Sequence, residues 1–312
     1  MKKKTINAVL AKKFEDFIKS IEDEKVQKLV KENSIITGGC IASMFLKEKV
    51  NDFDVYFTNK ETVLAVAHYY VHKFKSNRKK DDNDTGVEVP ISVLEDEDGR
   101  VKLVIKSAGI AAEDKGSNYQ YFEQHPEEVG TEYIDNVVSV FKEADNNEKP
   151  RYRPLFLSAN AITLSDKIQL VLRFYGEAKE IHDNYDFVHC TNYWESKTKK
   201  LVTNIDALES LLSKELQYIG SKYPIASLIR IRKFINRQWT INAGQILKIA
   251  HQTSNLDLTN IATLEDQLIG VDVAYFNELI DALKAHSDKE KEAGRTFTVD
   301  FGYLATIIDR IF

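Results

Sequence analysis

The sequence has few cysteines, and they lack the spacing of a structural metal site. Of the 312 residues only Cys40 and Cys190 are cysteines, and they are far apart in the chain. Disulfide-rich secreted folds and zinc modules need numerous or closely spaced cysteines. We therefore expect a protein of the reducing cytoplasm, in which Cys40 is a small packing residue and not a nucleophile.

Long apolar runs and an excess of positive charge are also missing. No window approaches the roughly 20 apolar residues that a membrane span needs. The apolar run in the N-terminal MKKKTINAVLAKK is too short for a secretion signal. Lys plus Arg number 43 against 48 Asp plus Glu, which gives a formal net charge of −5. These absences predict a cytoplasmic protein without a membrane partner, whose contacts with RNA must use a local basic patch.

The stretch GGCIASMFLKEKVNDFDVYF carries the pattern that is most informative about chemistry. The β-branched run over residues 34–37 predicts a strand that ends at the two glycines. Residues 40–48 then predict a short helix, and residues 50–57 alternate as a second strand. Because side chains two residues apart on a strand point to the same side, Asp52 and Asp54 are expected to project together.

Two neighbouring carboxylates beside a glycine turn indicate a metal and phosphate site. Such carboxylates repel each other, and a hard cation such as Mg²⁺ or Mn²⁺, bound together with substrate phosphates, relieves the repulsion. Glycine lets the main chain approach a phosphate closely, and the N–H groups that open the next helix favour negative charge. We expect Asp52 and Asp54 to bind the metal, and Gly38 and Gly39 to position a nucleoside triphosphate. The plainer alternative is an acidic strand end beside an ordinary turn.

This pattern resembles the head of the DNA polymerase β-like nucleotidyltransferase superfamily, in which a Gly-Gly or Gly-Ser turn precedes a strand with Asp-x-Asp. The spacing is most similar to the branch of tRNA nucleotidyltransferases and bacterial poly(A) polymerases. The branch's Arg-Asp pair falls on Ala42 and Ser43, so its contacts do not carry over. The sequence is also similar to uncharacterised nucleotidyltransferases of phage genomes. The residues that match the branch without a gap are Gly38, Gly39, Phe45, Leu46, Asp52 and Asp54.

The resemblance implies a transferase that moves a nucleoside monophosphate from an NTP such as ATP to an acceptor hydroxyl and releases pyrophosphate. By the same resemblance the acceptor is an RNA 3′ end, such as that of a tRNA, and the protein binds nucleotide and RNA. Two alternatives stay open: transfer to a small-molecule or protein hydroxyl, and a non-catalytic nucleotide- or partner-binding module on the same fold. The missing Arg-Asp pair favours the module, and the intact acid pair opposes it.

In two-metal phosphoryl transfer a third carboxylate near the acceptor hydroxyl usually holds the second metal ion and helps to deprotonate the attacking oxygen. Asp186 is the first candidate, because NYDFVHC reads as a short strand that could reach the acidic pair. The alternatives are Glu88, Asp183 or no third acid at all. His182 and His189 flank Asp186, and a histidine in such a place is more often a hydrogen-bonded structural residue than a base.

Basic residues are candidates for contacts with the triphosphate or with RNA. Arg173 lies among apolar residues of the predicted strand IQLVLRF, where burial requires a charged partner or a phosphate. Arg230, Lys233 and Arg237 share one face of the predicted helix SLIRIRKFINRQW. A solvated charged face is the alternative reading of that stripe. The stripe of this helix that is expected to dock consists of Leu228, Ile231 and Ile235.

The order of the remaining elements indicates an α+β protein. Periodicity predicts one or two helices within residues 5–32 and another over residues 61–74. A hairpin with Asp98-Gly99 at its turn is expected to extend the sheet. The segment YRPLFLSANAITLSDKIQLVLRFYG reads as two further strands. Strand signals cease near Trp194, and the pattern is helical from there to the end.

We therefore expect two domains. Residues 1–195 would form a mixed-sheet nucleotidyltransferase head with N-terminal helices, and residues 196–312 an all-helical domain. The triphosphate would bind in the cleft between them.

Overall fold

The computed structural model describes residues 1–78, 91–95, 99–104, 110–111, 150–158, 160–258 and 260–268, with residues 302, 305, 306 and 309. The chain forms two compact units. The first unit comprises residues 1–114 and 140–213, and the second comprises residues 115–139 and 214–312. The domain division expected after residue 195 falls inside the first unit.

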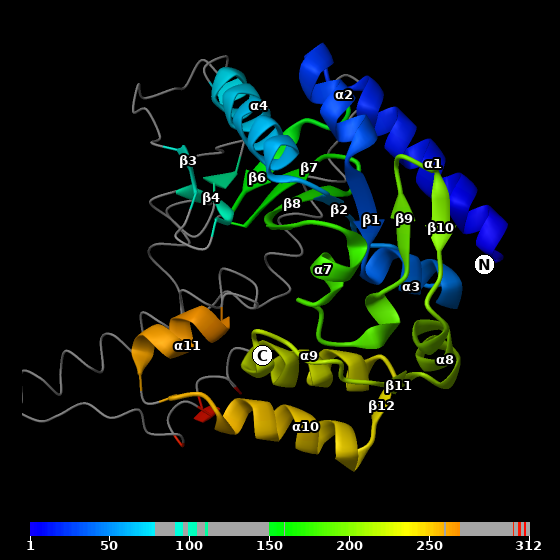
Figure 1. The fold of residues 1–312 in the computed structure, drawn as a ribbon, viewed down its shortest axis with the longest axis vertical. Helices are drawn as coiled ribbons and strands as arrows, with labels where there is room; N and C mark the ends of the chain where they lie inside the picture. The colour runs from blue at the N-terminus through cyan, green and yellow to red at the C-terminus, as the bar shows by residue number, and fades with distance from the viewer. Residues whose placement is uncertain are drawn as a thin grey trace, which may run out of the picture. The chain divides into compact units, whose positions relative to one another are not determined.

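A mixed sheet with the strand order β10-β9-β1-β2-β8-β7-β6-β5 forms the centre of the first unit (Figure 1). Strands β2 and β8 run parallel, and the other neighbours whose register is known run antiparallel. This sheet and its helices confirm the α+β class. The strands are β1 Ser34–Thr37, β2 Phe53–Phe57, β5 Ile110–Ala111, β6 Pro154–Leu157, β7 Ala161–Leu164, β8 Ile168–Tyr175, β9 Tyr193–Glu195 and β10 Lys200–Val202.

Helices α1 Lys3–Lys19, α2 Glu24–Glu32 and α4 Lys60–Arg78 cover one face of this sheet (Figure 1). Their buried side chains share one core with the strand residues that point to this face, such as Val55 and Leu170. Burial of that apolar surface is the main stabilising contribution of this layer. The helices predicted within residues 5–32 and over residues 61–74 are confirmed.

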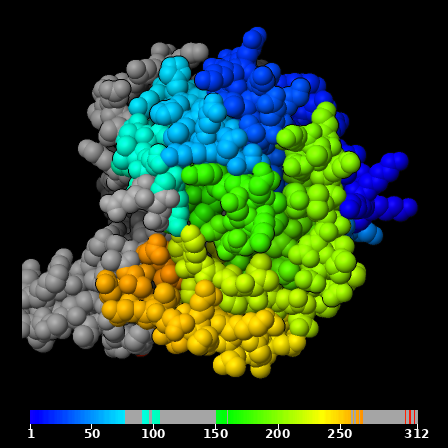
Figure 2. All heavy atoms as spheres, in the orientation of Figure 1, coloured from blue at the N-terminus to red at the C-terminus, as the bar shows by residue number. Residues whose placement is uncertain are grey.

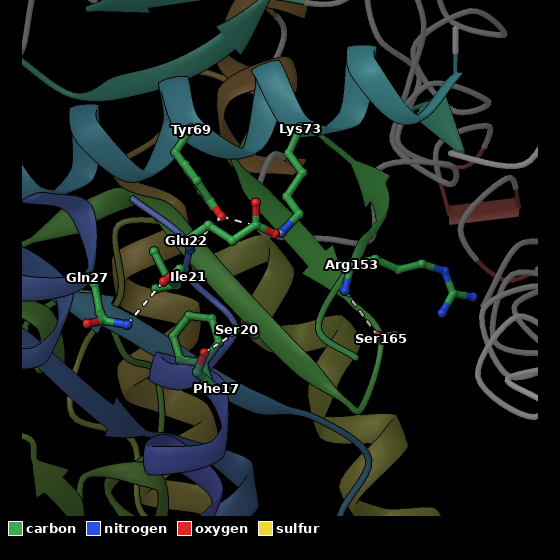
Figure 3. Close-up of polar contacts among 9 residues, drawn as sticks. All are labelled: Phe17, Ser20, Ile21, Glu22, Gln27, Tyr69, Lys73, Arg153 and Ser165. Carbon is green, nitrogen blue, oxygen red and sulfur yellow. Dashed lines mark hydrogen bonds and ion pairs between the residues drawn. The ribbon is translucent and has the colours of Figure 1, made fainter. Parts of the chain in front are cut away.

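Polar contacts fix these helices relative to one another (Figure 3). The side-chain amide of Gln27 on α2 donates to the carbonyl of Ile21 at 3.0 Å, in the connection between α1 and α2. On α4, the Lys73 ammonium donates to the Glu22 carboxylate at 3.0 Å and to the Tyr69 hydroxyl at 3.3 Å. Because Glu22 is largely exposed, the ion pair orients α4 more than it stabilises the fold.

The other face of the sheet carries the short helix α7 Ala178–His182. Ile181 of α7 packs against Ile35 of β1 and Tyr56 of β2. The chain then passes through a bend at Asp186 into the 3₁₀ turn η1 Val188–Cys190. The short strand predicted in NYDFVHC is therefore wrong. Both edges of β1 are taken by β2 and β9, so no strand position remains beside it for this segment.

Three further predictions about strands are wrong. Strands β3 Ser92–Glu95 and β4 Val101–Val104 pair with each other in a separate two-stranded sheet, and they do not extend the main one. The segment predicted as two strands forms three, β6 to β8. Strand signals do not cease near Trp194 either, because β10 follows β9 and pairs with it.

Two further helices complete the first unit: one starts at the glycine turn, and the other lies at the C-terminal end of the unit. Helix α3 Gly39–Leu46 begins at the second glycine of the turn and confirms the short helix predicted over residues 40–48. Helix α8 Ile205–Ser213 follows β10 and contacts both η1 and α3. The C-terminal end of the first unit therefore packs against the segments on both sides of the glycine turn.

The second unit is largely helical, with α9 Pro224–Asn236, α10 Ala243–Ser254 and α11 Ile261–Leu268. It also contains a parallel pair of two-residue strands, β11 Glu215–Leu216 and β12 Thr240–Ile241. Among the described helices of the whole chain, none has the length and apolar character to cross a membrane.

Helix α9 does not dock through the predicted stripe. Ile231 is buried, but Leu228 is 40% exposed and Ile235 is 51% exposed. The buried side of α9 instead runs through Ser227 and Ile231, which are four residues apart and share one face. The first turn of the helix, with the buried Ile225, supplies the remaining contact.

Candidate functional site

The turn between β1 and α3 places Gly38 against the acidic end of β2. Gly38 has a φ of +92°, which favours glycine, and its N–H donates to the carbonyl of Cys190 at 3.2 Å. A methyl group on Gly38 would lie 3.3 Å from Asp54 Oδ2 and 3.4 Å from the hydroxyl oxygen of Tyr185. A methyl group on the exposed Gly39 would meet no atom within 4 Å. Gly38 thus leaves room for Asp54, and Gly39 presents main chain to solvent.

Asp54 occupies the second position of β2, opposite Thr37 of β1. Phe53 and Val55 point into the core beneath α1 and α4, so Asp54 points to the other face, where it is half-buried. Asp52 is also half-buried, but it lies just before β2 begins. The structure therefore brings Asp54 to the glycine turn, and it places Asp52 next to the start of the same strand.

Asp52 and Asp54 are carboxylates that could hold a magnesium ion only together with further ligands, such as the phosphates of a nucleotide. Mg²⁺ in such complexes takes one or two carboxylates, with the remaining ligands from phosphates and water. Within the described ranges, no group of three His, Cys, Asp or Glu side chains could hold an ion. The structure thus does not join Asp186, which is buried, to Asp52 and Asp54. Asp183 is exposed at the end of α7, and Glu88 lies outside the described residues.

A neutral histidine ties β1 to the segment behind the turn. Thr37 Oγ1 lies 2.8 Å from His182 Nε2 and donates to the carbonyl of Asn192 at 3.0 Å. Burial lowers the pKa of His182 to about 4, so the imidazole is neutral at pH 7. Because the Thr37 proton goes to Asn192, we assign the ring proton to Nε2. His182 then orders α7 against β1, as expected of a structural histidine.

Two further groups around Asp54 stay protonated at neutral pH. Burial, and then the neighbouring Tyr56 and Asp54, raise the pKa of Tyr185 well above its ordinary value. Its hydroxyl stays protonated, is hydrogen-bonded with Tyr56 and lies near the Asp54 carboxylate. Cys40 is 3% exposed, and burial followed by the charge of Asp54 raises the pKa of its thiol. A nucleophilic thiolate does not form there at neutral pH.

The predicted basic residues come from other elements. Arg173 lies four positions beyond Gln169, which is the β8 partner of Asp54. Four strand residues span roughly 13 Å, and Arg173 Nη1 donates to Asn160 Oδ1 at 3.3 Å. Arg230 and Lys233 belong to α9 in the second unit. The contacts of these three basic residues with a triphosphate stay predictions.

A hollow of about 540 Å³ opens in the second unit between α9 and α10. Its lining includes Leu228, Ile246, Ala250 and Leu256. Since none of the predicted catalytic, metal or phosphate residues lines it, the hollow does not contribute to this site.

A mixed sheet with helices on it, followed by a largely helical region, defines the class: an α+β protein whose acidic strand end lies against a glycine turn. A sequence model of the Gabija anti-defense 2 family matches residues 8–214. The chain belongs to the Gabija anti-defense 2 family.

A curated relative shares this family's name. The protein "Gabija anti-defense 2" of Bacillus phage SPbetaL7 is 24% identical over 129 residues. The match covers 41% of this chain and 32% of the relative. The match with this relative therefore spans about a third of its length.

Solved structures of CCA-adding enzymes are similar at a low level. The Thermotoga maritima CCA-adding enzyme in complex with tRNA is 12% identical, with a TM-score of 0.37, and the match covers 95% of this chain and 68% of that one. The Bacillus stearothermophilus CCA-adding enzyme with CTP is 10% identical, with a TM-score of 0.39, and the match covers 85% and 50%.

Proposed function

We propose that the protein is a metal-dependent nucleotidyltransferase that acts in the family's role against the Gabija defence. One observation carries the proposal: the carboxylate of Asp54 lies against Gly38, a glycine with positive φ that opens a helix. Asp52 adds a second carboxylate one position before the strand. An acidic pair at a phosphate-binding turn is what transfer of a nucleoside monophosphate requires.

In the proposed reaction, the chain's own residues bind and orient the nucleotide. Asp52 and Asp54 would hold Mg²⁺ or Mn²⁺ together with the triphosphate. A bound ion neutralises phosphate charge and stabilises the charge that develops during transfer. The main chain at Gly39 approaches the phosphates, and the first N–H groups of α3 favour their negative charge. The Tyr185 hydroxyl, which is hydrogen-bonded with Tyr56, borders the turn on the side of the Asp54 carboxylate.

The acceptor hydroxyl attacks the α-phosphorus in line with the departing pyrophosphate. The new P–O bond forms as the bond to the β-phosphate breaks, and the hydroxyl proton passes to a base. Asp186 is the candidate base, because it lies buried next to Tyr185 in the segment that borders the turn. Its role is one of proton acceptance from the acceptor, separate from the metal-binding pair.

The acceptor is proposed to be an RNA 3′ end. This choice is supported by the resemblance of the glycine turn and acid pair to the tRNA nucleotidyltransferase branch. With a net charge of −5, binding of RNA would depend on local cations such as Arg230 and Lys233. Affinity for RNA should then fall steeply with added salt.

Membership of the Gabija anti-defense 2 family favours a second kind of acceptor, a protein. The match to the Gabija anti-defense 2 family over residues 8–214 covers the whole acidic site. A protein hydroxyl on a component of the Gabija defence is then the acceptor, and nucleotidylation would inactivate that component. Transfer to a protein hydroxyl would not require a basic surface that binds nucleic acid.

Labelled triphosphates decide between the acceptors. The protein is incubated with each of the four α-labelled NTPs, Mg²⁺ or Mn²⁺, and either total RNA or purified Gabija components. Label on RNA that is removed by ribonuclease supports the first acceptor, and label on protein that survives ribonuclease supports the second. If neither is labelled while ATP binds without any requirement for metal, the protein is a binding module and the proposed transferase is wrong.

A further inference from the structure

A row of polar side chains crosses the sheet at the end where the glycine turn lies. The strand register places Thr37 opposite Asp54, Asp54 beside Gln169, and Gln169 opposite Thr163. These four residues come from β1, β2, β8 and β7, which are consecutive in the sheet. Residues in register on neighbouring strands point to the same face, so the row lies on one surface.

Burial confirms which surface this is. Phe53, Ile168, Ile162 and Leu164 belong to the core beneath α1 and α4. Asp54, Gln169 and Thr163, which adjoin these residues along the strands, are half-buried on the opposite face. Figure 2 shows atoms of the green part of the chain, around residues 150–190, reaching the surface beside the cyan atoms of α4.

Gln169 is the neighbour of Asp54 on β8. It is the strand neighbour of Asp54 on the side away from Thr37, and adjacent strands lie roughly 4.8 Å apart. Within the described part of the chain, its side-chain amide has no hydrogen-bond partner. Unlike a carboxylate, a primary amide offers both donors and an acceptor, which complement a hydroxyl that donates and accepts.

We propose that Gln169 is a specificity-determining residue that binds a sugar hydroxyl of the nucleotide. The inference rests on the proposed function, because it takes the triphosphate to lie at Asp54 and the glycine turn. A ribose follows directly on the α-phosphate, so the position beside Asp54 is the one that its hydroxyls reach. The amide then selects a ribonucleotide over a deoxynucleotide, since a deoxynucleotide leaves the amide unpaired.

Calorimetry with ATP, 2′-deoxy-ATP and 3′-deoxy-ATP in the presence of Mg²⁺ tests this proposal on the full chain. The native protein should bind ATP about tenfold more tightly than one of the deoxy forms, and which form is weaker identifies the hydroxyl. Gln169→Leu keeps the approximate size of the side chain and removes its polar atoms. It should bind ATP as weakly as the native protein binds that deoxy form, without a preference between them.

Thr163→Val is the matched control, because Thr163 lies in the same row one strand further from Asp54. It should keep the native preference, and thermal unfolding should show that both variants are folded. The proposal is overturned if Gln169→Leu keeps the native ratio of affinities, if the native protein has no preference, or if Thr163→Val loses the preference as well. A native chain that binds no ATP at all would instead count against the proposed function.

Discussion

At the scale of single residues, the two glycines of the turn have different tasks. Gly38 combines a positive φ with the nearby carboxylate of Asp54, whereas Gly39 is exposed and starts α3. The sequence predicts the glycines and the acids because each has a chemical signature at a fixed spacing. It does not single out Tyr185 or Gln169, because their relation to Asp54 exists only through the fold and the strand register.

Substitution of each glycine by alanine separates these tasks. Gly38→Ala should lower the free energy of unfolding by about 1–3 kcal/mol, because the backbone angle disfavours a side chain. It should also weaken metal-dependent nucleotide binding, since the new methyl crowds Asp54. Gly39→Ala should leave stability unchanged or raise it by up to about 1 kcal/mol, yet reduce transfer if phosphate lies there. Urea unfolding measures the stability of each variant, and transfer rates measure its activity. Equal losses of stability in the two variants would contradict this account.

His182 gives stability a specific dependence on pH. Its folded pKa of about 4 lies below the ordinary value of 6.5, so the unfolded chain binds more protons between these limits. Stability due to this group is therefore present above pH 6.5 and is lost as pH falls towards 4. The loss is at most about 3 kcal/mol.

The comparison with His182→Gln measures this dependence. Glutamine can still donate to Thr37 but does not titrate. In urea unfolding at pH 7.5, 6.0, 5.0 and 4.5, the native protein should lose more stability than the variant over this interval. Parallel curves for the two proteins would show that His182 is not the group responsible.

At the scale of elements, one hydroxyl joins β1 to α7 and to the segment that leads into β9. Thr37 Oγ1 contacts His182 and the carbonyl of Asn192, and its side chain is fully buried. Thr37→Val keeps the shape and removes these hydrogen bonds, so it should cost about 1–3 kcal/mol in the free energy of unfolding.

Thr37→Ser keeps the hydroxyl and is the control for this change. In chemical denaturation, the serine variant should have a free energy of unfolding close to that of the native protein, and the valine variant a clearly lower one. If serine is destabilised as much as valine, packing of the methyl group, and not the hydrogen bonds, holds these elements together.

Local periodicity predicts the strand, turn, helix and strand around the glycines, because each is defined by its own residues. The sequence does not predict β9 and β10, whose three-residue runs carry little pattern of their own. Trp194 is in β9 because Ile36, far away in the chain, is its partner on β1. The hairpin of β3 and β4 was recognisable from alternation, but alternation does not determine which sheet a hairpin joins.

At the scale of the whole molecule, the first compact unit runs to Ser213. Beyond residue 195 it gains β10, which pairs with β9, and α8, which contacts η1 and α3. Asn204, before α8, also donates to the side chains of Asn192 and Thr191. These contacts hold the segment that borders the glycine turn.

A fragment of residues 1–213 should therefore fold, and a fragment of residues 1–195 should not. The shorter fragment leaves the edge of β9 unpaired, which favours aggregation, and removes the packing of α8. Thermal unfolding followed by circular dichroism should show a cooperative transition for 1–213 alone. A cooperative transition for the shorter fragment would mean that β10 and α8 are dispensable.

The central claim, that Asp52 and Asp54 bind the metal of a nucleotidyl-transfer site, is tested most directly by transfer of label from α-labelled triphosphates. The native chain is compared with Asp52→Asn and Asp54→Asn, each checked for folding, in the presence of Mg²⁺ and the responsive acceptor. We expect each variant to lose at least about a hundredfold in rate, because asparagine keeps the shape but removes the charge that binds the cation. Transfer at the native rate in both variants would contradict the account.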